Sequence, residues 1–427
     1  MNAATRLRTL VTTVALGCLL TSQPAFAQGS ADVVLEWNRI LNTALQTPGA
    51  HPATIFVTRT AAMVQIAVFD ALNSIDPVYK PYVTAVNVPQ GASRDAAAAQ
   101  AAHDVLVALM PSLTATYDAA LAANLSRTDS ASAAAGSAVG AAAARAILTA
   151  RANDGWNRPS AAYILPALPG YWQPTPPANA VAGFVNYQDV QGFILASARS
   201  LLVEPPPAMT STRYTTDFNE VKAIGSATST TRTAAETAIA NTWAAVGNTT
   251  NPISAWNVGM QDLTRSRNLN GLDAARMFAL VNMAMHDGLW VTFTGKFTYG
   301  LWRPVTAIRE AARDGNAATE ADPNWLPLLA TPPYPSYPGN MTCLGIASAA
   351  TLTKLLGRDD IPFSITWTGA AGAANIVRSY NGFRQAADEE ARSRVLGGIH
   401  FTFDNDVSKG VCTVLGDYAA ANYLYRR

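Results

Sequence analysis

The fourteen residues from Arg59 to Leu72 read RTAAMVQIAVFDAL, and they align without gaps on Arg276 to Leu289, which read RMFALVNMAMHDGL. Six of the fourteen positions are identical. Apolar residues recur at a spacing of three to four in both stretches, which predicts two helices with one apolar face each. A buried Asp needs hydrogen-bond donors, so we expect Asp70 and Asp287 to tie the far ends of these helices to neighbouring segments. The alternative is chance similarity between two Ala-rich helices.

Helical periodicity extends over most of the chain. Further stretches with this spacing are 96–109, 130–152, 233–246, 341–356 and 406–425. Alternating β-branched runs are scarce, and the abundant Ala between 92 and 152 favours helix. Three Pro-rich stretches predict loops, at 165–177, 205–207 and 323–338. We therefore predict an all-α fold, and a genuine repeat would divide it into two related bundles at about 34–200 and 231–427.

The first 27 residues predict a secretory signal peptide. Arg6 and Arg8 form a short positive region, residues 10–20 are apolar but too few to span a bilayer, and Ala25-Phe26-Ala27 suits cleavage after Ala27. The remaining domain, 28–427, would then be periplasmic or secreted. No membrane span is expected in it, because charges interrupt every later apolar stretch.

Charge and cysteine content limit the classes of partner. Without the signal peptide, 28 basic residues face 29 acidic ones, so nothing predicts binding to nucleic acid or to anionic lipid. Cys343 and Cys412 either pair in an oxidising compartment or remain buried thiols, and the sequence leaves both alternatives open. It leaves the oligomeric state open as well.

Two segments in the last third combine charge with helix starts. Lys296 and Arg303 lie seven residues apart, and Pro304 predicts that a helix starts directly after Arg303. Two such charges taken alone are more often solvated. The second segment, 331–343, is an extended Pro-rich run that ends where a helix begins. Helix N-termini bind anions, although a plain loop is the commoner meaning of such a run.

A third segment runs from Ser393 to Asp404. The Gly397-Gly398 pair predicts a helix end, with Arg394 in the last helical turn. His400 lies four residues before Asp404, so the carboxylate could accept one ring N–H and leave Nε2 of His400 free as a ligand or a nucleophile. The alternative is a structural histidine beside an Asp.

In order and spacing, the three segments closely resemble the signature of the vanadium-dependent haloperoxidase and type-2 phosphatidic acid phosphatase superfamily. That signature reads K-x6-R-P, then P-S-G-H, then S-R-x5-H-x3-D. Its first and third parts are intact here, as Lys296, Arg303 and Pro304 and as Ser393, Arg394, His400 and Asp404. Less specific similarities to the bacterial secreted haloperoxidase-like branch lie at Asp154-Gly155, Pro205-Pro206-Pro207, Arg232-Thr233 and Thr306-Ala307-Ile308. The resemblance covers most of 34–427.

The resemblance implies two four-helix bundles and a role for each motif residue. Lys296, Arg303 and Arg394 would neutralise the oxygens of vanadate or phosphate, since charge-assisted hydrogen bonds are the strong ones. His400 would be the axial ligand to vanadium, or the nucleophile that takes a phosphoryl group. Asp404 would orient the His400 ring.

The middle part of the signature is changed, because Gly339-Asn340-Met341 stands where the family has Ser-Gly-His. Gly339 and Asn340 can still donate N–H groups to an oxyanion. Met341 replaces the family's acid–base histidine, and losing such a group typically costs about a hundredfold to ten-thousandfold in rate. His286 could substitute only if the loop after its helix folds back, because the ten residues to Lys296 rise about 15 Å in a helix. Otherwise His286 is structural.

Three functions are compatible with these motifs. The leading one is a vanadium-dependent haloperoxidase-like protein that oxidises halide with hydrogen peroxide, impaired by Met341. The second is an acid phosphatase that cleaves phosphate esters through a phosphohistidine on His400. The third is a non-catalytic oxyanion-binding protein, which Met341 favours. The bound group would be vanadate, phosphate in its place, or none, and the sequence does not identify the halide or the organic substrate.

Overall fold

The computed structural model describes residues 30–51 and 54–427, so the predicted signal peptide lies outside the described residues. Within them the chain forms thirteen α-helices and one antiparallel hairpin. The first five helices are α1 Asp32–Gln46, α2 Val57–Ile75, α3 Arg94–Leu109, α4 Thr114–Leu125 and α5 Ser130–Ala150. The next five are α6 Thr212–Ile224, α7 Ala234–Trp243, α8 Pro252–Ser266, α9 Gly271–Tyr299 and α10 Pro304–Arg309. The remaining elements are α11 Asn340–Leu356, β1 Phe363–Trp367, β2 Ile376–Tyr380, α12 Phe383–Leu396 and α13 Thr402–Asn422.

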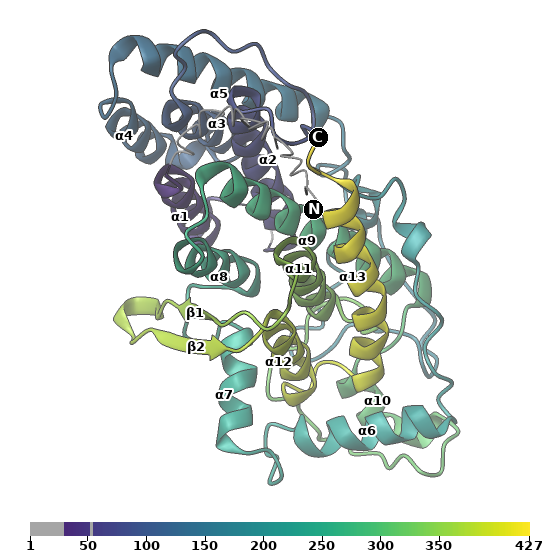
Figure 1. The fold of residues 1–427 in the computed structure, drawn as a ribbon. Helices are drawn as coiled ribbons and strands as arrows, with labels where there is room; N and C mark the ends of the chain where they lie inside the picture. The colour runs from purple at the N-terminus through teal and green to yellow at the C-terminus, as the bar shows by residue number, and fades with distance from the viewer. Residues whose placement is uncertain (1–29, 52–53) are drawn as a thin grey trace, which may run out of the picture.

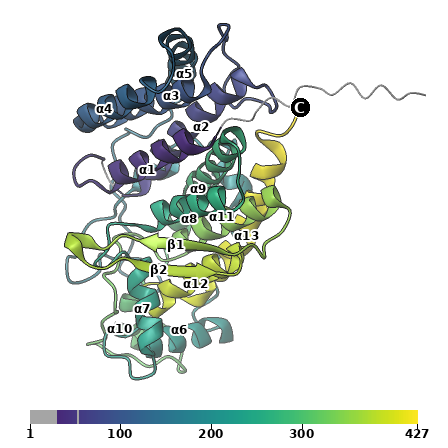
Figure 2. The same ribbon diagram turned by 60° about the vertical axis from the view of Figure 1, so that its left-hand side comes forward.

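The helices are arranged around a long central one. Helices α1 to α5 lie at one end of the molecule, and α6, α7, α10 and α12 lie toward the other (Figures 1 and 2). Between them runs α9, whose 29 residues span about 44 Å. Nearly all of α9 is buried, because α2 of the first group packs against it, as do α11 and α13. The prediction of an all-α fold is confirmed.

The two aspartates of the predicted repeat hold equivalent positions. Asp70, in α2, accepts the backbone N–H groups of Tyr82 and Val83 at 2.8 and 2.9 Å. Asp287, in α9, accepts those of residues 193–195 at 2.6, 2.9 and 2.8 Å. Burial raises the pKa of each carboxyl to about 6. Both aspartates tie their helices to a neighbouring loop, as expected, while the division into halves stays a prediction.

Helix α5 is the described helix whose length and composition would suit a membrane span, with a mean hydropathy of 1.3 over its most apolar window. It packs tightly against α3, because a Cβ on Gly136 would lie 2.2 Å from the Ser93 carbonyl oxygen and one on Gly140 would lie 2.3 Å from that of Ala97. Buried helices of bundles share this length and composition. The feature is therefore weak evidence for a span.

Candidate oxyanion site

The predicted site residues lie at the ends of four helices. Lys296 is in the last turn of α9, and Arg303 is the N-cap of α10, directly before the proline that starts it. Arg394 is in the last turn of α12, and Asp404 is in the first turn of α13. His400 lies in the link between those two helices, and all five side chains are buried. Helix α10 starts at Pro304 and helix α12 ends directly before Gly397, as predicted from these two residues.

Asp404 holds the ring of His400 in one orientation. Nδ1 of His400 lies 2.8 Å from Oδ2 of Asp404, the contact that their spacing predicted. The Ser336 hydroxyl donates to the same oxygen at 2.5 Å, and the Phe401 backbone N–H does so at 3.2 Å. Burial raises the pKa of Asp404 to about 6, while the Ser336 hydroxyl and the nearby cations oppose the rise. Ser336 was not identified from the sequence.

The other ring nitrogen of His400 faces a cation. Nη1 of Arg303 lies 3.1 Å from Nε2 of His400. A guanidinium can only donate, so Nε2 carries the lone pair and Nδ1 carries the proton that Asp404 accepts. Burial, followed by the charges of Arg303, Lys296 and Arg394, lowers the pKa of His400 well below its ordinary value. The ring is therefore a neutral imidazole at physiological pH.

The arginines each keep one donor unused. Arg303 donates from Nε to the Tyr334 carbonyl and from Nη1 to the Ile399 carbonyl, both at 2.7 Å, while its Nη2 has no partner among the described residues. Arg394 donates from Nε to Ser393 Oγ at 3.0 Å, and its buried Nη2 likewise lacks a partner. Burial lowers the pKa of Arg303 to about 10, so the guanidinium remains charged. The charge of Arg394 also contributes to that lowering, which places the two guanidinium groups within electrostatic reach of each other.

The segment that replaces the family's Ser-Gly-His supplies a third unused donor. Gly339 donates its backbone N–H to the Asp404 carbonyl at 2.9 Å, so it does not have that group free for an oxyanion. Asn340 begins α11, is 1% exposed, and has no protein partner for Nδ2 in the described part of the chain. Met341 follows in the first turn, partly exposed and packed against the main core. Unpaired buried donors typically cost about 1–3 kcal/mol each, so the cluster fits a small ligand with several acceptor oxygens.

Lys296 differs from the prediction. Its ammonium donates to the carbonyl oxygens of Pro335, Ser336 and Pro338 at 3.1, 2.6 and 2.6 Å. An ammonium has three donors, so all of them are engaged by the loop that leads to α11. Burial, together with the charge of Arg303, lowers the pKa of Lys296 well below its ordinary value. Lys296 thus contributes positive charge and fixes the loop, whereas direct contact with an oxyanion would require it to release a carbonyl.

Both the amino-acid sequence and the fold are similar to those of known proteins. Residues 276–426, which hold every residue of this cluster, match the family model described as the VCPO second helical-bundle domain. Vanadium chloroperoxidase of Curvularia inaequalis is 25% identical over 194 residues, which are 35% of this chain and 31% of that enzyme. Residues 276–426 therefore match the second helical-bundle domain of a vanadium chloroperoxidase family.

The haloperoxidase fold extends beyond the matched bundle. The crystal structure of a bacterial vanadium-dependent iodoperoxidase has a TM-score of 0.79 at 22% identity, and it covers 93% of this chain and 97% of that one. A holo-type bacterial vanadium-dependent chloroperoxidase has a TM-score of 0.73 at 17% identity, with 93% and 98% covered. These likenesses confirm the predicted haloperoxidase-like fold over almost the whole chain. The Curvularia inaequalis enzyme, in contrast, is matched over about a third of its length.

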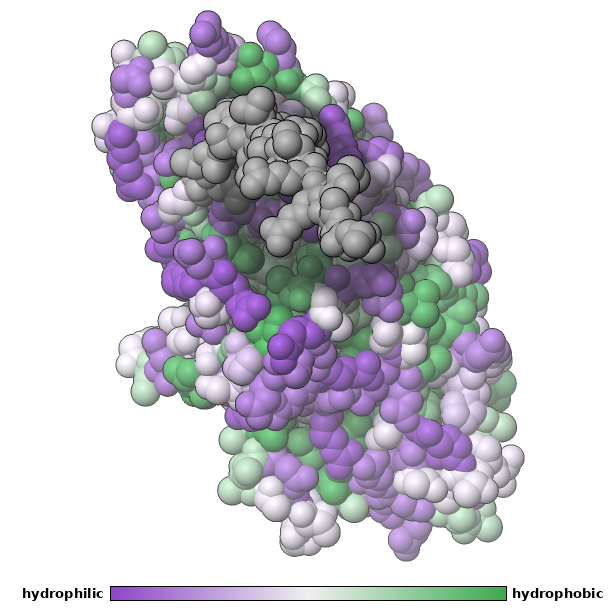
Figure 3. All heavy atoms as spheres, viewed as in Figure 1, coloured by the Kyte–Doolittle hydropathy of each residue, from purple (hydrophilic) through white to green (hydrophobic). Residues whose placement is uncertain are grey.

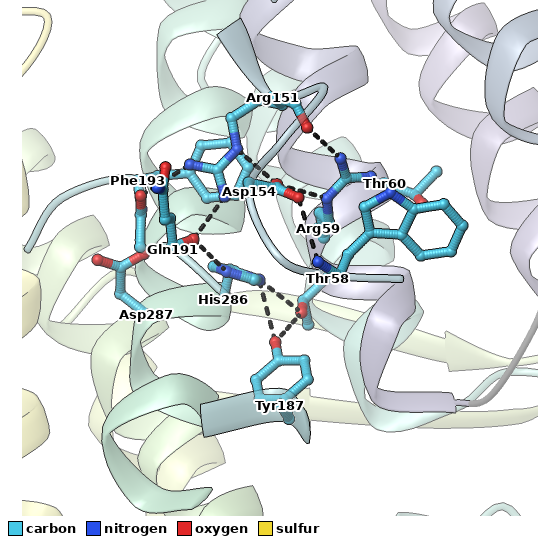
Figure 4. Close-up of polar contacts among 12 residues, drawn as sticks. Thr58, Arg59, Thr60, Arg151, Asp154, Tyr187, Gln191, Phe193, His286 and Asp287 are labelled. Atoms are coloured by element: carbon cyan, nitrogen blue, oxygen red, sulfur yellow. Dashed lines mark hydrogen bonds and ion pairs between the residues drawn. The ribbon is translucent and has the colours of Figure 1, made fainter. Parts of the chain in front are cut away.

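His286 does not join the cluster in this haloperoxidase-like chain. Its Nδ1 lies 3.0 Å from Tyr187 Oη and 3.4 Å from Thr58 Oγ1, and its Nε2 lies 3.2 Å from the Gln191 carbonyl (Figure 4). Ten residues of the continuous helix α9, about 15 Å, separate His286 from Lys296. The loop does not fold back, so His286 is not placed to replace the lost acid–base group.

The surroundings of His286 form a separate buried polar cluster. Asp154 accepts from Nε of Arg59 at 2.7 Å and from Nε of Arg151 at 2.8 Å (Figure 4). Arg151 also donates to the Gly192 carbonyl at 2.8 Å, and its guanidinium lies 3.9 Å from the centre of the Phe193 ring. These contacts join α2, the end of α5 and the loop beside α9, which indicates a structural role.

Two further features lie next to the cluster. Cys343 and Cys412 form a disulfide with a Cα–Cα distance of 5.3 Å, so the two cysteines are paired and are not the buried thiols of the alternative. The disulfide joins the first turn of α11 to the middle of α13. Glu390, which the sequence analysis did not single out, is fully buried one turn before Arg394 on α12. A charge four residues from a motif arginine was the signal that could have found Glu390.

Proposed function

We propose that the chain binds a small tetrahedral oxyanion, vanadate or phosphate, between its two motif arginines, Asn340 and His400. We further propose that with vanadate it oxidises halide with hydrogen peroxide at a reduced rate. One observation carries the proposal: three donors from three separate elements are buried without protein partners, at Arg303 Nη2, Arg394 Nη2 and Asn340 Nδ2. Planar guanidinium groups suit the oxygens of such an anion.

Each residue has a distinct task in this proposal. The unused N–H groups of the arginines would bind oxyanion oxygens, while Lys296 adds charge and holds the loop before α11. Asp404 and Ser336 keep the His400 ring oriented, so that its Nε2 lone pair can face the central atom once Arg303 shifts its Nη1 bond wholly to the Ile399 carbonyl. Bound vanadate would supply an electrophilic centre at which hydrogen peroxide is activated toward halide.

The reduced rate follows from position 341. Met341 lies in the first turn of α11 beside Asn340, where the family has its acid–base histidine, and a thioether cannot transfer a proton. His286 is held elsewhere by Tyr187 and Gln191. Proton transfer to and from peroxide would then depend on solvent, which costs about a hundredfold or more in rate.

A phosphatase is the second candidate, because His400 is neutral and carries its lone pair on Nε2. A neutral imidazole fixed by a carboxylate is suited to attack phosphorus. Without an acid at position 341, such an enzyme would favour esters whose leaving groups need no protonation. Met341 also favours the third candidate, oxyanion binding without turnover.

Three assays separate these functions. Bromination of a phenolic indicator with vanadate, peroxide and bromide would support the haloperoxidase. Hydrolysis of an aryl phosphate that vanadate inhibits would support the phosphatase. Binding of vanadate with neither activity would leave the non-catalytic protein, and the absence of vanadate and phosphate binding would refute all three.

Restoring the acid–base group gives a sharper test. We expect Met341→His to raise either activity by roughly tenfold or more, which is less than the hundredfold to ten-thousandfold that a fully positioned acid–base group supplies. Met341→Leu is the matched control, since it changes the packing at this position without adding a titratable group. Equal rates in the histidine and leucine variants would mean that proton transfer at position 341 does not limit turnover.

We also propose that the protein is periplasmic or secreted. The Cys343–Cys412 disulfide supports this location, because disulfides persist mainly in oxidising compartments. The test is the N-terminal sequence of the protein exported by cells, which should begin directly after Ala27.

A further inference from the structure

Glu390 is a fully buried carboxyl group with one unsatisfied oxygen. Its Oε2 accepts from the indole nitrogen of Trp256 at 2.9 Å, and its Oε1 has no partner among the described residues. A buried carboxylate without a cation partner is costly, so such a group either pairs or keeps its proton. The role of Glu390 therefore depends on what surrounds it.

The carboxyl group lies beside the candidate oxyanion site on two helices. On α12 it precedes Arg394 by four residues, which places the two side chains on the same face. Across the interface it packs against α11, because a Cβ on Gly345 would lie 2.3 Å from Oε2 of Glu390. Gly345 follows Met341 by one helical turn, about 6 Å along α11. Glu390 is thus one turn away from the site on both helices.

The charged group that acts on Glu390 lies on the same helix, α12. Arg394 is the charged group that acts on its carboxyl, whereas α8 contributes the Trp256 indole and α11 contributes Gly345. Arg394 and Glu390 nevertheless form no ion pair within 4.0 Å, and each keeps an unpartnered atom in the described part of the chain. Burial, opposed by Trp256 and Arg394, raises the pKa of Glu390 to about 8.

We propose that Glu390, when it is ionised, is a counter-charge to Arg394, and that this ionised form takes up one proton from solvent when a dianion binds at the arginines. The proposal rests on the oxyanion site described above. A bound dianion competes for the positive potential of Arg394 and adds negative charge one turn away. Ionised Glu390 is then destabilised, so the carboxylate accepts a proton and binding becomes pH-dependent.

The outer face of α12 supplies a control. Hydrophilic residues gather over the middle of the surface in Figure 3, where α12 lies. Asp388 on that helix is partly exposed and pairs with Arg384 and Lys409 at 3.3 and 2.8 Å. It is an acidic residue near Glu390 in sequence that does not act on Arg394. Asp388→Asn therefore removes a carboxylate from α12 without touching the proposed coupling.

The test is sulfate binding, measured by titration calorimetry in the wild type, Glu390→Gln and Asp388→Asn. Sulfate stays a dianion across the range, so its own titration does not enter. About one pH unit below the Glu390 pKa all three proteins should bind alike. About one unit above it, wild type and Asp388→Asn should bind about tenfold more weakly than Glu390→Gln. Titrations above the Glu390 pKa, run in two buffers of different ionisation enthalpy, give the number of protons taken up per sulfate bound. This number should be higher by close to one in wild type than in Glu390→Gln.

Each outcome of these titrations either supports or overturns the proposal for Glu390. Equal proton uptake in wild type and Glu390→Gln would overturn the counter-charge role while leaving the oxyanion site intact. Failure of wild type to bind sulfate at any pH would overturn this proposal, and failure to bind phosphate and vanadate as well would refute the oxyanion site. Burial lowers the pKa of Lys296, but this residue is common to all three proteins, so any proton that it exchanges cancels in the comparison. If Glu390→Gln does not fold, Glu390→Met replaces it, and a wild-type affinity that does not fall above the Glu390 pKa overturns the proposal without any variant.

Discussion

Asn340→Ala should weaken oxyanion binding without weakening the fold. The Asn340 side chain is 1% exposed, and its Nδ2 donates to nothing among the described residues. A hydrogen bond from this group to an anion should contribute about 1.5–3 kcal/mol, which corresponds to roughly a 10- to 150-fold loss of affinity on substitution. Stability without ligand should stay the same or rise by about 1 kcal/mol, because the variant removes an unsatisfied buried amide and loses little packing.

Thr342→Val is the matched control in the same helical turn. The Thr342 hydroxyl donates to Asn405 Oδ1 at 2.7 Å, so its hydrogen-bonding capacity is used within the protein. Its replacement should cost about 1–2 kcal/mol of stability and leave anion affinity unchanged. Asn340→Ala should therefore lose anion affinity and keep its stability, whereas Thr342→Val should lose stability and keep its anion affinity.

The assays are urea denaturation in buffer free of oxyanions and calorimetric titration with sulfate. If Asn340→Ala unfolds at clearly lower urea concentration and binds sulfate as well as wild type does, the amide serves the fold. Unpartnered donors would then be no indication of a ligand anywhere in the cluster. Asn340 is the most direct position for this test, since both arginines also hold backbone carbonyls or neighbouring side chains.

Three further predictions concern stability. Lys296→Met should cost about 2–4 kcal/mol, because it strands three buried carbonyls of the loop before α11, and an unchanged urea midpoint would contradict that role. Replacing both Cys343 and Cys412 by Ala should cost about 4 kcal/mol, as expected for a loop with a sequence separation of 69, and a reductant should shift the wild type but not this variant. Glu390, with its pKa raised to about 8, keeps a proton that the unfolded chain releases. Stability should therefore fall as pH rises from about 4.5 to about 8, and the fall should be smaller in Glu390→Gln; identical slopes would refute the assignment.

The sequence was most informative where apolar residues face one side of a helix. The two repeat stretches and the other periodic segments all correspond to helices of the structure, although the segments 130–152, 233–246 and 406–425 run two or three residues past the helix ends. Helices α1 and α8 were not predicted, in part because they bury amides that interrupt the apolar pattern. Asn38 Nδ2 donates to Asn257 Oδ1 at 2.9 Å, and Asn257 Nδ2 donates to Asn282 Oδ1 at 3.0 Å. A polar residue that is satisfied by another helix cannot be recognised as buried from its own segment.

The hairpin was missed for a different reason. Phe363, Ile365 and Trp367 alternate with less buried residues along β1, which is the period of a strand. The run is only five residues long, and such short alternation is ambiguous in a chain dominated by helical periodicity. Strand β2 carries exposed residues at both Ile376 and Val377, so its pattern gives no support.

At the candidate site, residue types and spacing predicted which side chains lie near helix ends but not where every donor points. The contact of His400 with Asp404 follows from a spacing of four at a helix start. The Lys296 ammonium instead meets carbonyl oxygens, whose direction depends on the path of the Pro-rich loop rather than on any side chain. Glu390 was not identified from the sequence, because Trp256 and Gly345, which bury it, come from distant segments.

The energetics of the cluster bear on what the chain does. A buried donor without a partner typically costs about 1–3 kcal/mol, so in a fold with no ligand to bind the Nη2 groups of Arg303 and Arg394 would each carry that cost. Both are present with unused donors, and Asn340 adds one where the family has glycine. The change at Met341 removes proton transfer and leaves these donors in place. Oxyanion binding is therefore the part of the proposed function that the described residues support most directly, and the proposed limit on turnover lies at Met341.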